Sequence, residues 1–246
     1  MAHYLYAARK AGATLTVGVL SRSGRRRVRQ FAVALGYGPT PRLPVVSLKD
    51  LVGSDVPLRL FDAEITDWNV RLVDLVAINA VVSRFAPRAA FEIGTGDGLT
   101  ALNMAGNMPA GARLYTLNLP PEHAGIPHAR DVGERFHRSE LKDGIVQLFG
   151  DSKQFDFSPF RGAMDLVFVD GDHTAEAVAR DSDEALRLTR PDGGVILWHD
   201  YGLRRGVTEV LDDLPRRHGL DGHLVAIQGT WIACLVRGPG AAAAHS

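Results

Sequence analysis

Acidic and histidine side chains follow two apolar runs in the second half of the chain, where they could act together on a ligand. Asp170, Asp172 and His173 come directly after one run, and His199 and Asp200 come directly after the next. If both runs are neighbouring parallel strands, their ends open on the same edge of a sheet. Converging carboxylates form an oxygen-rich site that suits Mg²⁺. A histidine with an ordinary pKa of ~6.5 could also take a proton there.

A glycine-rich segment, Gly94–Gly98, follows an earlier apolar run. Glycines let the backbone turn tightly and approach a ligand, and the helix that follows offers free N–H groups. The spacing differs from the dinucleotide fingerprint G-x-G-x-x-G, because the third glycine falls one position early and Leu99 stands in its place. Glu92, two residues before the first glycine, suits a cationic ligand better than a pyrophosphate. A nucleotide-dependent oxidoreductase stays an alternative that this spacing argues against.

Short apolar runs alternate with helical patterns through the segment that carries these residues. Thr66 or Asp67 is a plausible cap of a helix that Pro87 stops. Two further helices are predicted, from about Leu99 and around 177–188. The alternation predicts an α/β fold with a parallel sheet covered by helices on both faces. The predicted strands span residues 89–93, 113–117, 145–149, 166–169 and 195–198, and a hairpin spans 224–227 and 231–236.

The glycine segment resembles the first motif, E/D-x-G-x-G-x-G, of the class I S-adenosylmethionine-dependent methyltransferases. Three further segments also resemble this family, at Leu114–Leu119, Gly150–Ser152 and Asp165–Asp170. The resemblance covers roughly residues 65–237, and its segments occur in the order that the family shows. It implies a Rossmann-like, doubly wound, mostly parallel seven-stranded sheet with a C-terminal antiparallel hairpin, and S-adenosyl-L-methionine as the cofactor. The residues that it implies for cofactor binding are Glu92, Gly94, Thr95, Gly96, Asp97, Gly98, Asn118, Leu119, Asp151, Ser152 and Asp170.

Asn118 departs from the family pattern, which has an acidic residue at the end of the second strand to accept hydrogen bonds from the ribose hydroxyls. An amide oxygen still accepts, but it is neutral, and charge-assisted hydrogen bonds are roughly twice as strong. The sequence therefore predicts weaker cofactor binding than in other members, or a changed use of the pocket.

The second cluster resembles the metal-dependent O-methyltransferases, especially the macrocin O-methyltransferase-like branch that acts on sugars of natural products, with catechol O-methyltransferase as a more distant relative. The resemblance implies Asp170, His199 and Asp200 as metal ligands, with Mg²⁺ as the metal. It implies His173 as the catalytic base, together with Asp170 as a catalytic residue. His199 stands where that branch has glutamate, and an imidazole is a softer ligand that adds no negative charge.

The charge distribution sets residues 1–64 apart as an N-terminal extension. Residues 1–60 hold ten Lys and Arg against two acidic residues, whereas residues 61–246 hold eighteen against twenty-six. We expect the extension to pack on the core or to form a homodimer interface, followed by a methyltransferase domain at 65–237 and a flexible tail at 238–246. Arg22–Arg29 could bind phosphates, but the run lacks interleaved aromatic residues, which argues against a nucleic-acid partner.

The prediction for function is methyl transfer from S-adenosylmethionine to a hydroxyl of a small molecule, as in natural product biosynthesis. The alternatives are a cofactor-binding protein with a non-methylating reaction and an RNA methyltransferase. The segment 120–144 is predicted to shape substrate access, with Phe136 as a contact. The single cysteine, Cys234, and the lack of a signal peptide or a membrane span favour the cytoplasm.

Overall fold

The computed structural model describes most of the chain, and the description below concerns those residues alone. They are residues 28, 30–33, 35, 37–66, 69–123, 132–220 and 224–238. Asp67, nearly all of the run Arg22–Arg29 and almost the whole C-terminal tail lie outside them.

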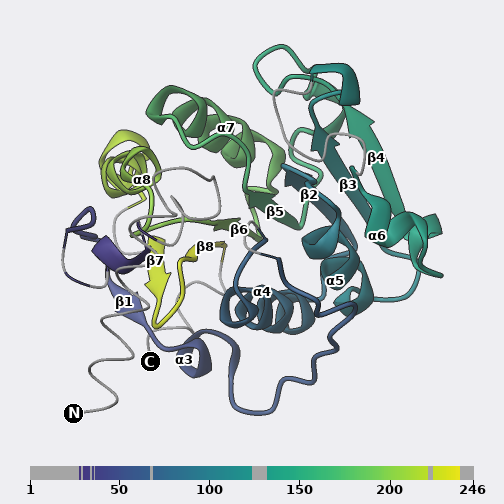
Figure 1. Cartoon of the computed structure of the whole chain (residues 1–246), viewed down its shortest axis with the longest axis horizontal. Helices are drawn as coiled ribbons and strands as arrows, with labels where there is room; N and C mark the ends of the chain where they lie inside the picture. The colour runs from purple at the N-terminus through teal and green to yellow at the C-terminus, as the bar shows by residue number, and fades with distance from the viewer. Residues whose placement is uncertain are drawn as a thin grey trace.

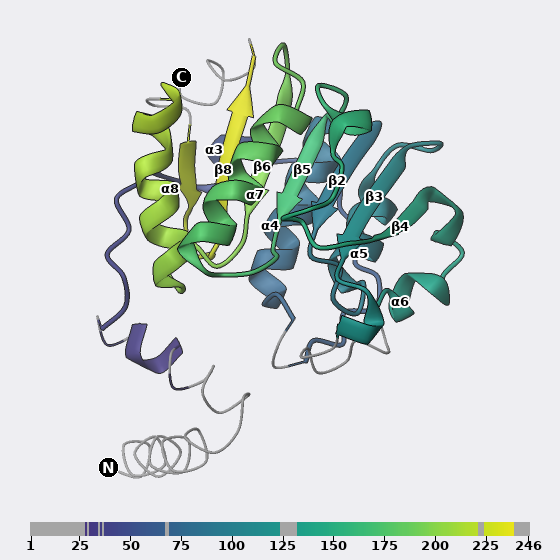
Figure 2. The same cartoon turned by 90° about the horizontal axis from the view of Figure 1, so that it is seen from above.

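A single eight-stranded sheet forms the centre of the molecule, with helices on both faces (Figure 1). The strands lie in the order β1-β7-β8-β6-β5-β2-β3-β4, and only β8 runs antiparallel to its neighbours. In Figure 2 the arrow of β8 points opposite to that of β5. The strands are β1 (Val45–Val46), β2 (Ala89–Ile93), β3 (Arg113–Asn118), β4 (Ile145–Phe149), β5 (Leu166–Val169), β6 (Gly194–Trp198), β7 (Leu224–Ile227) and β8 (Ala233–Arg237).

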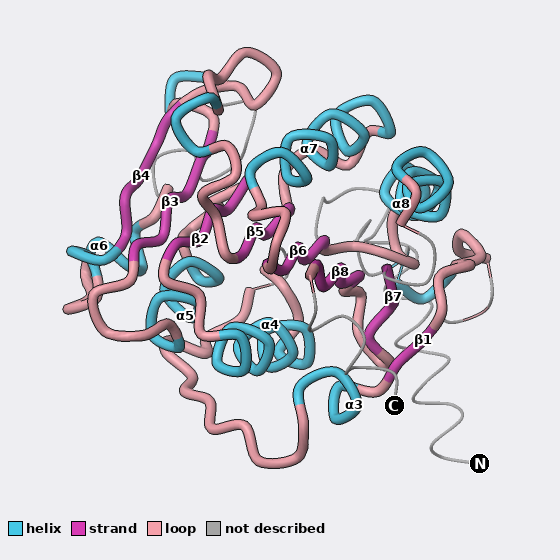
Figure 3. The backbone as a smooth tube through the Cα atoms, turned by 180° about the vertical axis from the view of Figure 1, so that it is seen from behind, coloured by secondary structure: helices cyan, strands magenta, loops and turns pink. Residues whose placement is uncertain are grey.

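The helices form one layer on each side of this sheet, and each layer buries its own apolar cluster. Helices α3, α4 and α5 lie on one face, and α7 and α8 lie on the other, as Figure 3 shows from behind. The helices are α3 (Leu48–Val52), α4 (Leu72–Phe85), α5 (Leu99–Asn107), α6 (Glu134–His137), α7 (Ala175–Leu188) and α8 (Arg205–His218). This architecture confirms the predicted Rossmann-like α/β fold with its C-terminal hairpin. No helix among the described residues is long and apolar enough to cross a membrane.

The sheet has one strand more than predicted, because the N-terminal extension contributes β1. Val45 and Val46 pair in parallel with Ala226 and Ile227 of β7. Backbone bonds from Ala226 N to Pro44 O (2.8 Å) and from Gln228 N to Val46 O (2.9 Å) complete the pairing. The added strand satisfies backbone groups that β7 would otherwise leave unpaired at the edge of the sheet.

Helix α4 begins at Leu72, several residues later than the predicted start near Thr66, so that boundary was wrong. The Asn69 side chain accepts hydrogen bonds from both the backbone N–H and the hydroxyl of Thr66, at 3.0 and 2.7 Å. This local turn competes with helix formation, as short polar side chains often do. The predicted end holds, because Ala86 adopts a left-handed conformation (φ 45°) directly before Pro87.

Candidate active site

Backbone hydrogen bonds continue past the ends of the strands and place the two predicted clusters side by side. Gly94 N donates to Leu117 O (2.8 Å), Asp170 N donates to Ile93 O (2.8 Å) and His199 N donates to Val169 O (3.1 Å). The glycine loop, Asp170 and His199 therefore lie next to one another at the carboxyl edge of the sheet, where ligands bind in open α/β folds.

The glycine loop lies directly on the end of β5. Gly94, Gly96 and Gly98 all have positive φ angles, of 105°, 55° and 88°. A Cβ atom on Gly94 would lie 2.2 Å from the carbonyl oxygen of Asp170. Only glycine combines that backbone conformation with so close an approach, so the residue types of the loop follow from its geometry.

Polar side chains from distant segments hold the loop in shape. Asp97 accepts from Arg135 Nε at 2.7 Å and from Asn69 Nδ2 at 3.1 Å. Thr95 Oγ1 lies 2.7 Å from Thr116 Oγ1. Asp97 thus supports the loop through contacts that the sequence did not indicate, since Asn69 and Arg135 are far from it along the chain.

Phe136 does not line the substrate path, contrary to the prediction. Its side chain is buried, with 1% exposed. A Cβ on Gly98 would lie 2.6 Å from its ring, so the ring packs against the glycine loop.

Glu92 lies beneath the loop as a fully buried carboxyl group. The Thr116 hydroxyl donates to its Oε2 atom at 2.5 Å, while its Oε1 atom has no hydrogen-bond partner among the described residues. Burial raises the pKa of Glu92 to about 8, against the opposing effect of the Thr116 hydrogen bond. A positively charged ligand in the loop would favour the ionised form of this carboxyl group, which fits a sulfonium cofactor.

The shifted pKa of Glu92 gives a test by pH. The folded protein keeps the proton up to a pH of about 8, whereas the unfolded chain loses it near the ordinary glutamate pKa of 4.5. The contribution of Glu92 to the unfolding free energy is therefore complete below pH 4.5 and declines as the pH rises toward 8. We expect the unfolding free energy of the wild type, relative to Glu92→Gln, to fall by up to about 1.4 kcal/mol per pH unit in that window. Urea unfolding of both proteins across this range measures the difference, and parallel curves would contradict it.

The other residues predicted to bind the cofactor, Asn118, Leu119, Asp151 and Ser152, lie at the ends of β3 and β4. Asn118 Oδ1 accepts from Gly96 N at 3.4 Å, and its Nδ2 atom donates to Leu119 O at 3.0 Å. Asp151 accepts from Lys153 N at 2.9 Å. Ser152 forms a hydrogen bond to Asp181, a buried residue of α7 that the sequence did not single out. Burial raises the pKa of Asp181 to about 6.

Asn118→Asp is expected to tighten S-adenosylmethionine binding about fivefold. A carboxylate makes hydrogen bonds that are stronger than those of an amide by about 1 kcal/mol. Isothermal titration calorimetry of both proteins with S-adenosylmethionine measures the change. Unchanged or weaker binding would count against a ribose-binding role for this position.

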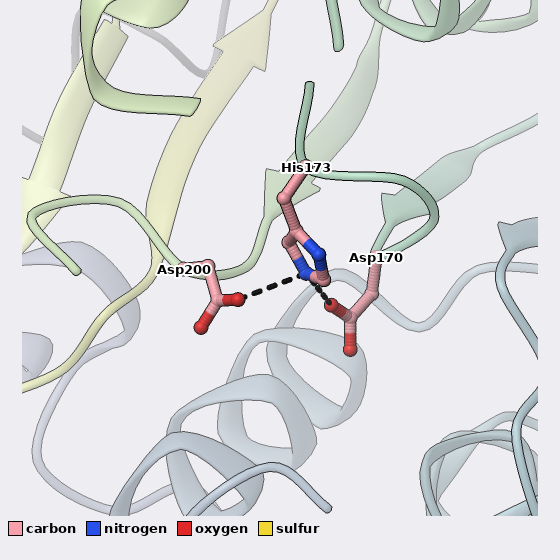
Figure 4. A group of neighbouring side chains, drawn as sticks. All are labelled: Asp170, His173 and Asp200. Carbon is pink, nitrogen blue, oxygen red and sulfur yellow. Dashed lines mark ion pairs between the residues drawn. The ribbon is translucent and has the colours of Figure 1, made fainter. Parts of the chain in front are cut away.

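The second cluster brings two histidines and two aspartates together, from the segments after β5 and β6. Figure 4 shows three of them, Asp170, His173 and Asp200. His173 Nε2 lies 2.9 Å from Asp200 Oδ2 and 4.0 Å from Asp170 Oδ1. His199 Nδ1 lies 3.2 Å from Asp170 Oδ1 and 3.4 Å from Asp200 Oδ1. Asp200 adopts a left-handed conformation (φ 65°), which is strained for a non-glycine residue and is typical of functional sites.

Asp74 of α4 lies behind the cluster and was not indicated by the sequence. Its carboxylate is fully buried, and it accepts from His199 Nε2 (3.4 Å), from the Trp231 backbone N–H (2.9 Å) and from two nitrogens of Arg71 (2.7 and 2.8 Å). Burial alone would raise the pKa of Asp74, but the hydrogen bonds from His199 and Arg71 outweigh it and lower the pKa to about 2. Asp74 therefore stays ionised and fixes the imidazole ring of His199.

Both histidines have raised pKa values because they face carboxylates. Burial opposes the positive charge of His173, but Asp200 and Asp170 more than compensate and raise its pKa. The pKa of the fully buried His199 lies well above its ordinary value, because Asp170 and Asp200 overcome the same burial effect.

A cavity of about 420 Å³ opens beside His173. One wall comes from the segment after β5, at Asp172 and His173, and another from Arg204 and Arg205 at the start of α8. A third wall is supplied by residues of the N-terminal extension, among them Tyr37. The volume lies in the usual range for small-molecule sites, roughly 300–1,000 Å³.

The predicted metal ligands depart from an oxygen-only Mg²⁺ site in two ways. Asp170, His173 and Asp200 each bring one ligand atom to within 4.8 Å of the others. However, His199 replaces an acidic ligand with an imidazole, and Asp200 Oδ2 is also paired with Arg204 Nε at 3.1 Å. The cationic groups around both carboxylates reduce the negative charge that would attract a divalent ion, so the residues present do not fit Mg²⁺.

Comparison with known proteins agrees with the fold and the glycine loop. Residues 91–201 match the family model described as a methyltransferase domain. Over 114 residues the chain is 27% identical to catechol O-methyltransferase of Mus musculus, a match that covers 42% of this chain and 40% of the relative. The matched part thus spans well under half the length of that curated relative.

Two solved structures share the fold at low sequence identity. The O-methyltransferase from Bacillus cereus, in complex with SAH, has a TM-score of 0.50 at 18% identity and covers 72% of this chain and 84% of its own. The O-methyltransferase TomG from Streptomyces achromogenes, involved in tomaymycin synthesis and in complex with SAM, has a TM-score of 0.52 at 18% identity, covering 74% and 92%.

Residues 91–201, which match the methyltransferase domain, make up less than half of the chain. Together the similarities support a class I S-adenosylmethionine-dependent O-methyltransferase that resembles the catechol O-methyltransferase-like branch, as the sequence motifs indicated. The macrocin O-methyltransferase-like resemblance stays a prediction.

Proposed function

We propose that this chain transfers a methyl group from S-adenosylmethionine to a hydroxyl of a small molecule, such as a sugar or another natural product. The observation that carries the proposal is the His173–Asp200 pair, with 2.9 Å between the ring nitrogen and the carboxylate oxygen, at the wall of the cavity. The same pair lies beside the glycine loop, because Gly94 packs on the backbone of Asp170. A base, an acceptor space and a cofactor loop thus occur at one edge of the sheet.

The role of His173 follows from its hydrogen bond. Asp200 accepts a hydrogen bond from the Nε2–H group of His173, which leaves Nδ1 as the nitrogen that accepts a proton from the acceptor hydroxyl. The hydroxyl oxygen forms a bond to the methyl carbon as the bond from that carbon to sulfur breaks. S-adenosylmethionine supplies a good leaving group when bound, so the protein's task is to align the hydroxyl and to remove its proton. The Asp200 carboxylate stabilises the protonated ring that results.

The remaining residues of the site bind the cofactor and position the acceptor. The glycine loop and Asn118 would hold the cofactor, and Asp151 and Ser152 would lie on its adenine side. The cavity sets the size of the acceptor, and Tyr37 gives it an aromatic surface from the N-terminal extension. The predicted Mg²⁺ takes no part in the proposed reaction, because the residues at its site do not fit the ion.

The predicted partners and location remain part of this proposal. A homodimer formed through the N-terminal extension is testable by light scattering of the full chain. A cytoplasmic location rests on the single cysteine, which is buried. A nucleic-acid acceptor is not proposed, because the cavity beside His173 has the size of a small-molecule site.

The experiment is incubation of the purified chain with S-adenosylmethionine and a set of polyhydroxylated sugars and phenols, followed by mass spectrometry. A product heavier by one CH₂ group together with S-adenosylhomocysteine supports the proposal. Turnover of an acceptor without a methylated product would indicate the non-methylating alternative. A thermal-shift assay tests the choice of cofactor. If NAD or NADP stabilises the protein and S-adenosylmethionine does not, the proposal that S-adenosylmethionine is the cofactor is contradicted.

A further inference from the structure

The buried imidazole of His199 lies among three carboxylates that come from different parts of the chain. Asp170 follows β5, Asp200 follows β6 and Asp74 lies in the first turn of α4. Both ring nitrogens face a carboxylate oxygen, with Nδ1 3.2 Å from Asp170 and Nε2 3.4 Å from Asp74. Carboxylate oxygens can only accept hydrogen bonds, so both edges of the ring are occupied and the imidazole fills the centre of the cluster.

This imidazole lies where a divalent ion would have to bind in order to bridge Asp170 and Asp200. The His199 Nδ1 atom is 3.2 and 3.4 Å from one oxygen of each. The other oxygen of Asp200 lies 3.1 Å from Arg204 Nε and 2.9 Å from His173 Nε2. Two carboxylates are thus surrounded by two imidazoles and a guanidinium, and a divalent cation would have to displace these groups or be repelled by them.

We infer that this site works without a divalent metal, because the side chain of His199, held from behind by Asp74, takes the place of the ion between Asp170 and Asp200. The inference rests on the proposed function and specifies how that function is carried out. His199 is a positioning residue: it has only 5% of its surface exposed and no ring nitrogen left for an acceptor. It keeps Asp200 in place to orient His173, and the proton of the acceptor hydroxyl goes to His173 alone.

The inference predicts that one substitution converts the cluster into a metal site. His199→Asp removes the imidazole ring that fills the space between Asp170 and Asp200 and adds a carboxylate there, which gives the oxygen-rich set that Mg²⁺ and Mn²⁺ prefer. We expect full-length wild-type protein to bind no Mn²⁺ at this site, as followed by electron paramagnetic resonance of free Mn²⁺. We expect His199→Asp to bind one Mn²⁺ with a dissociation constant at least about 10-fold below the highest Mn²⁺ concentration at which the wild type shows no binding. Mg²⁺ should also raise the thermal midpoint of the variant and not that of the wild type.

Two further variants make the result specific. His137→Asp adds a carboxylate at an exposed histidine of α6 and should not bind Mn²⁺ more tightly than the wild type does. If His199→Asp fails to fold because of repulsion from Asp74, the double variant Asp74→Asn/His199→Asp removes that repulsion and should show the gain.

One stoichiometric metal ion in the wild type, detected by Mn²⁺ titration or by elemental analysis for zinc, would overturn the inference if Asp170→Asn abolished it. A folded His199→Asp protein or folded double variant without any gain in metal binding would also overturn it. These results do not depend on methyl transfer. Calorimetry with S-adenosylmethionine on the wild type tests the proposed function separately, so that the two failures are distinguishable.

Discussion

Replacement of His173 by alanine is expected to lower kcat at least ~100-fold and to leave the affinity for S-adenosylmethionine unchanged. Loss of a general base typically costs about two to four orders of magnitude. The side chain is partly exposed at the wall of the cavity, with 37% of its surface accessible, so its removal should cost little stability. Single-turnover and steady-state assays with an acceptor identified by mass spectrometry measure the rate, and calorimetry measures the cofactor affinity.

The matched control is His137→Ala, since His137 is an exposed histidine on α6 away from the cavity walls. It should retain the wild-type kcat. Retained activity in His173→Ala would contradict the assignment of His173 as the base. Loss of cofactor binding in that variant would instead indicate a structural role for His173.

Replacement of Asp74 by alanine is expected to lower the unfolding free energy by about 3–5 kcal/mol, which is the usual cost of removing one partner from a buried charge cluster. The substitution leaves His199 and Arg71 without their common carboxylate, and it removes the acceptor of the Trp231 backbone N–H. The Arg71 guanidinium also lies 3.5 Å from the centre of the Trp231 ring, so the loss extends to the packing between α4 and the C-terminal hairpin. Urea unfolding followed by circular dichroism measures the change.

Asp213→Ala provides the comparison for this prediction. Asp213 pairs with Arg216 on the surface of α8, with 38% of the aspartate side chain exposed. Exposed pairs of this kind contribute roughly 0–1 kcal/mol. Similar losses of unfolding free energy in the two variants would contradict the prediction that the buried Asp74 carboxylate stabilises the fold more than a surface ion pair does.

The parts of the site that the sequence predicted are those with a local signal. The loop Gly94–Gly98 is recognisable because its backbone turns require glycine at fixed positions. Asp170, His173 and Asp200 are recognisable because they directly follow apolar runs that read as buried strands, whose carboxyl ends meet at one edge of the sheet. The fold followed from the same alternation of strands and helices.

The parts that the sequence missed depend on contacts between distant positions. Asp74 and His199 are 125 residues apart, and Arg135 and Asp97 are 38 residues apart. Along the chain Asp74 looks like an acidic residue in the first turn of a helix, which is a common and unremarkable pattern. The strand at Val45–Val46 was missed for the same reason, because two residues carry no periodicity and pair only once β7 is in place.

The most direct test of the whole account is a crystal structure of the chain with S-adenosylhomocysteine bound. We expect the nucleoside on the loop Gly94–Gly98, with its ribose beside Asn118 and its sulfur facing the cavity wall that carries His173. A nucleoside bound elsewhere, or a sulfur facing away from His173, would contradict the account.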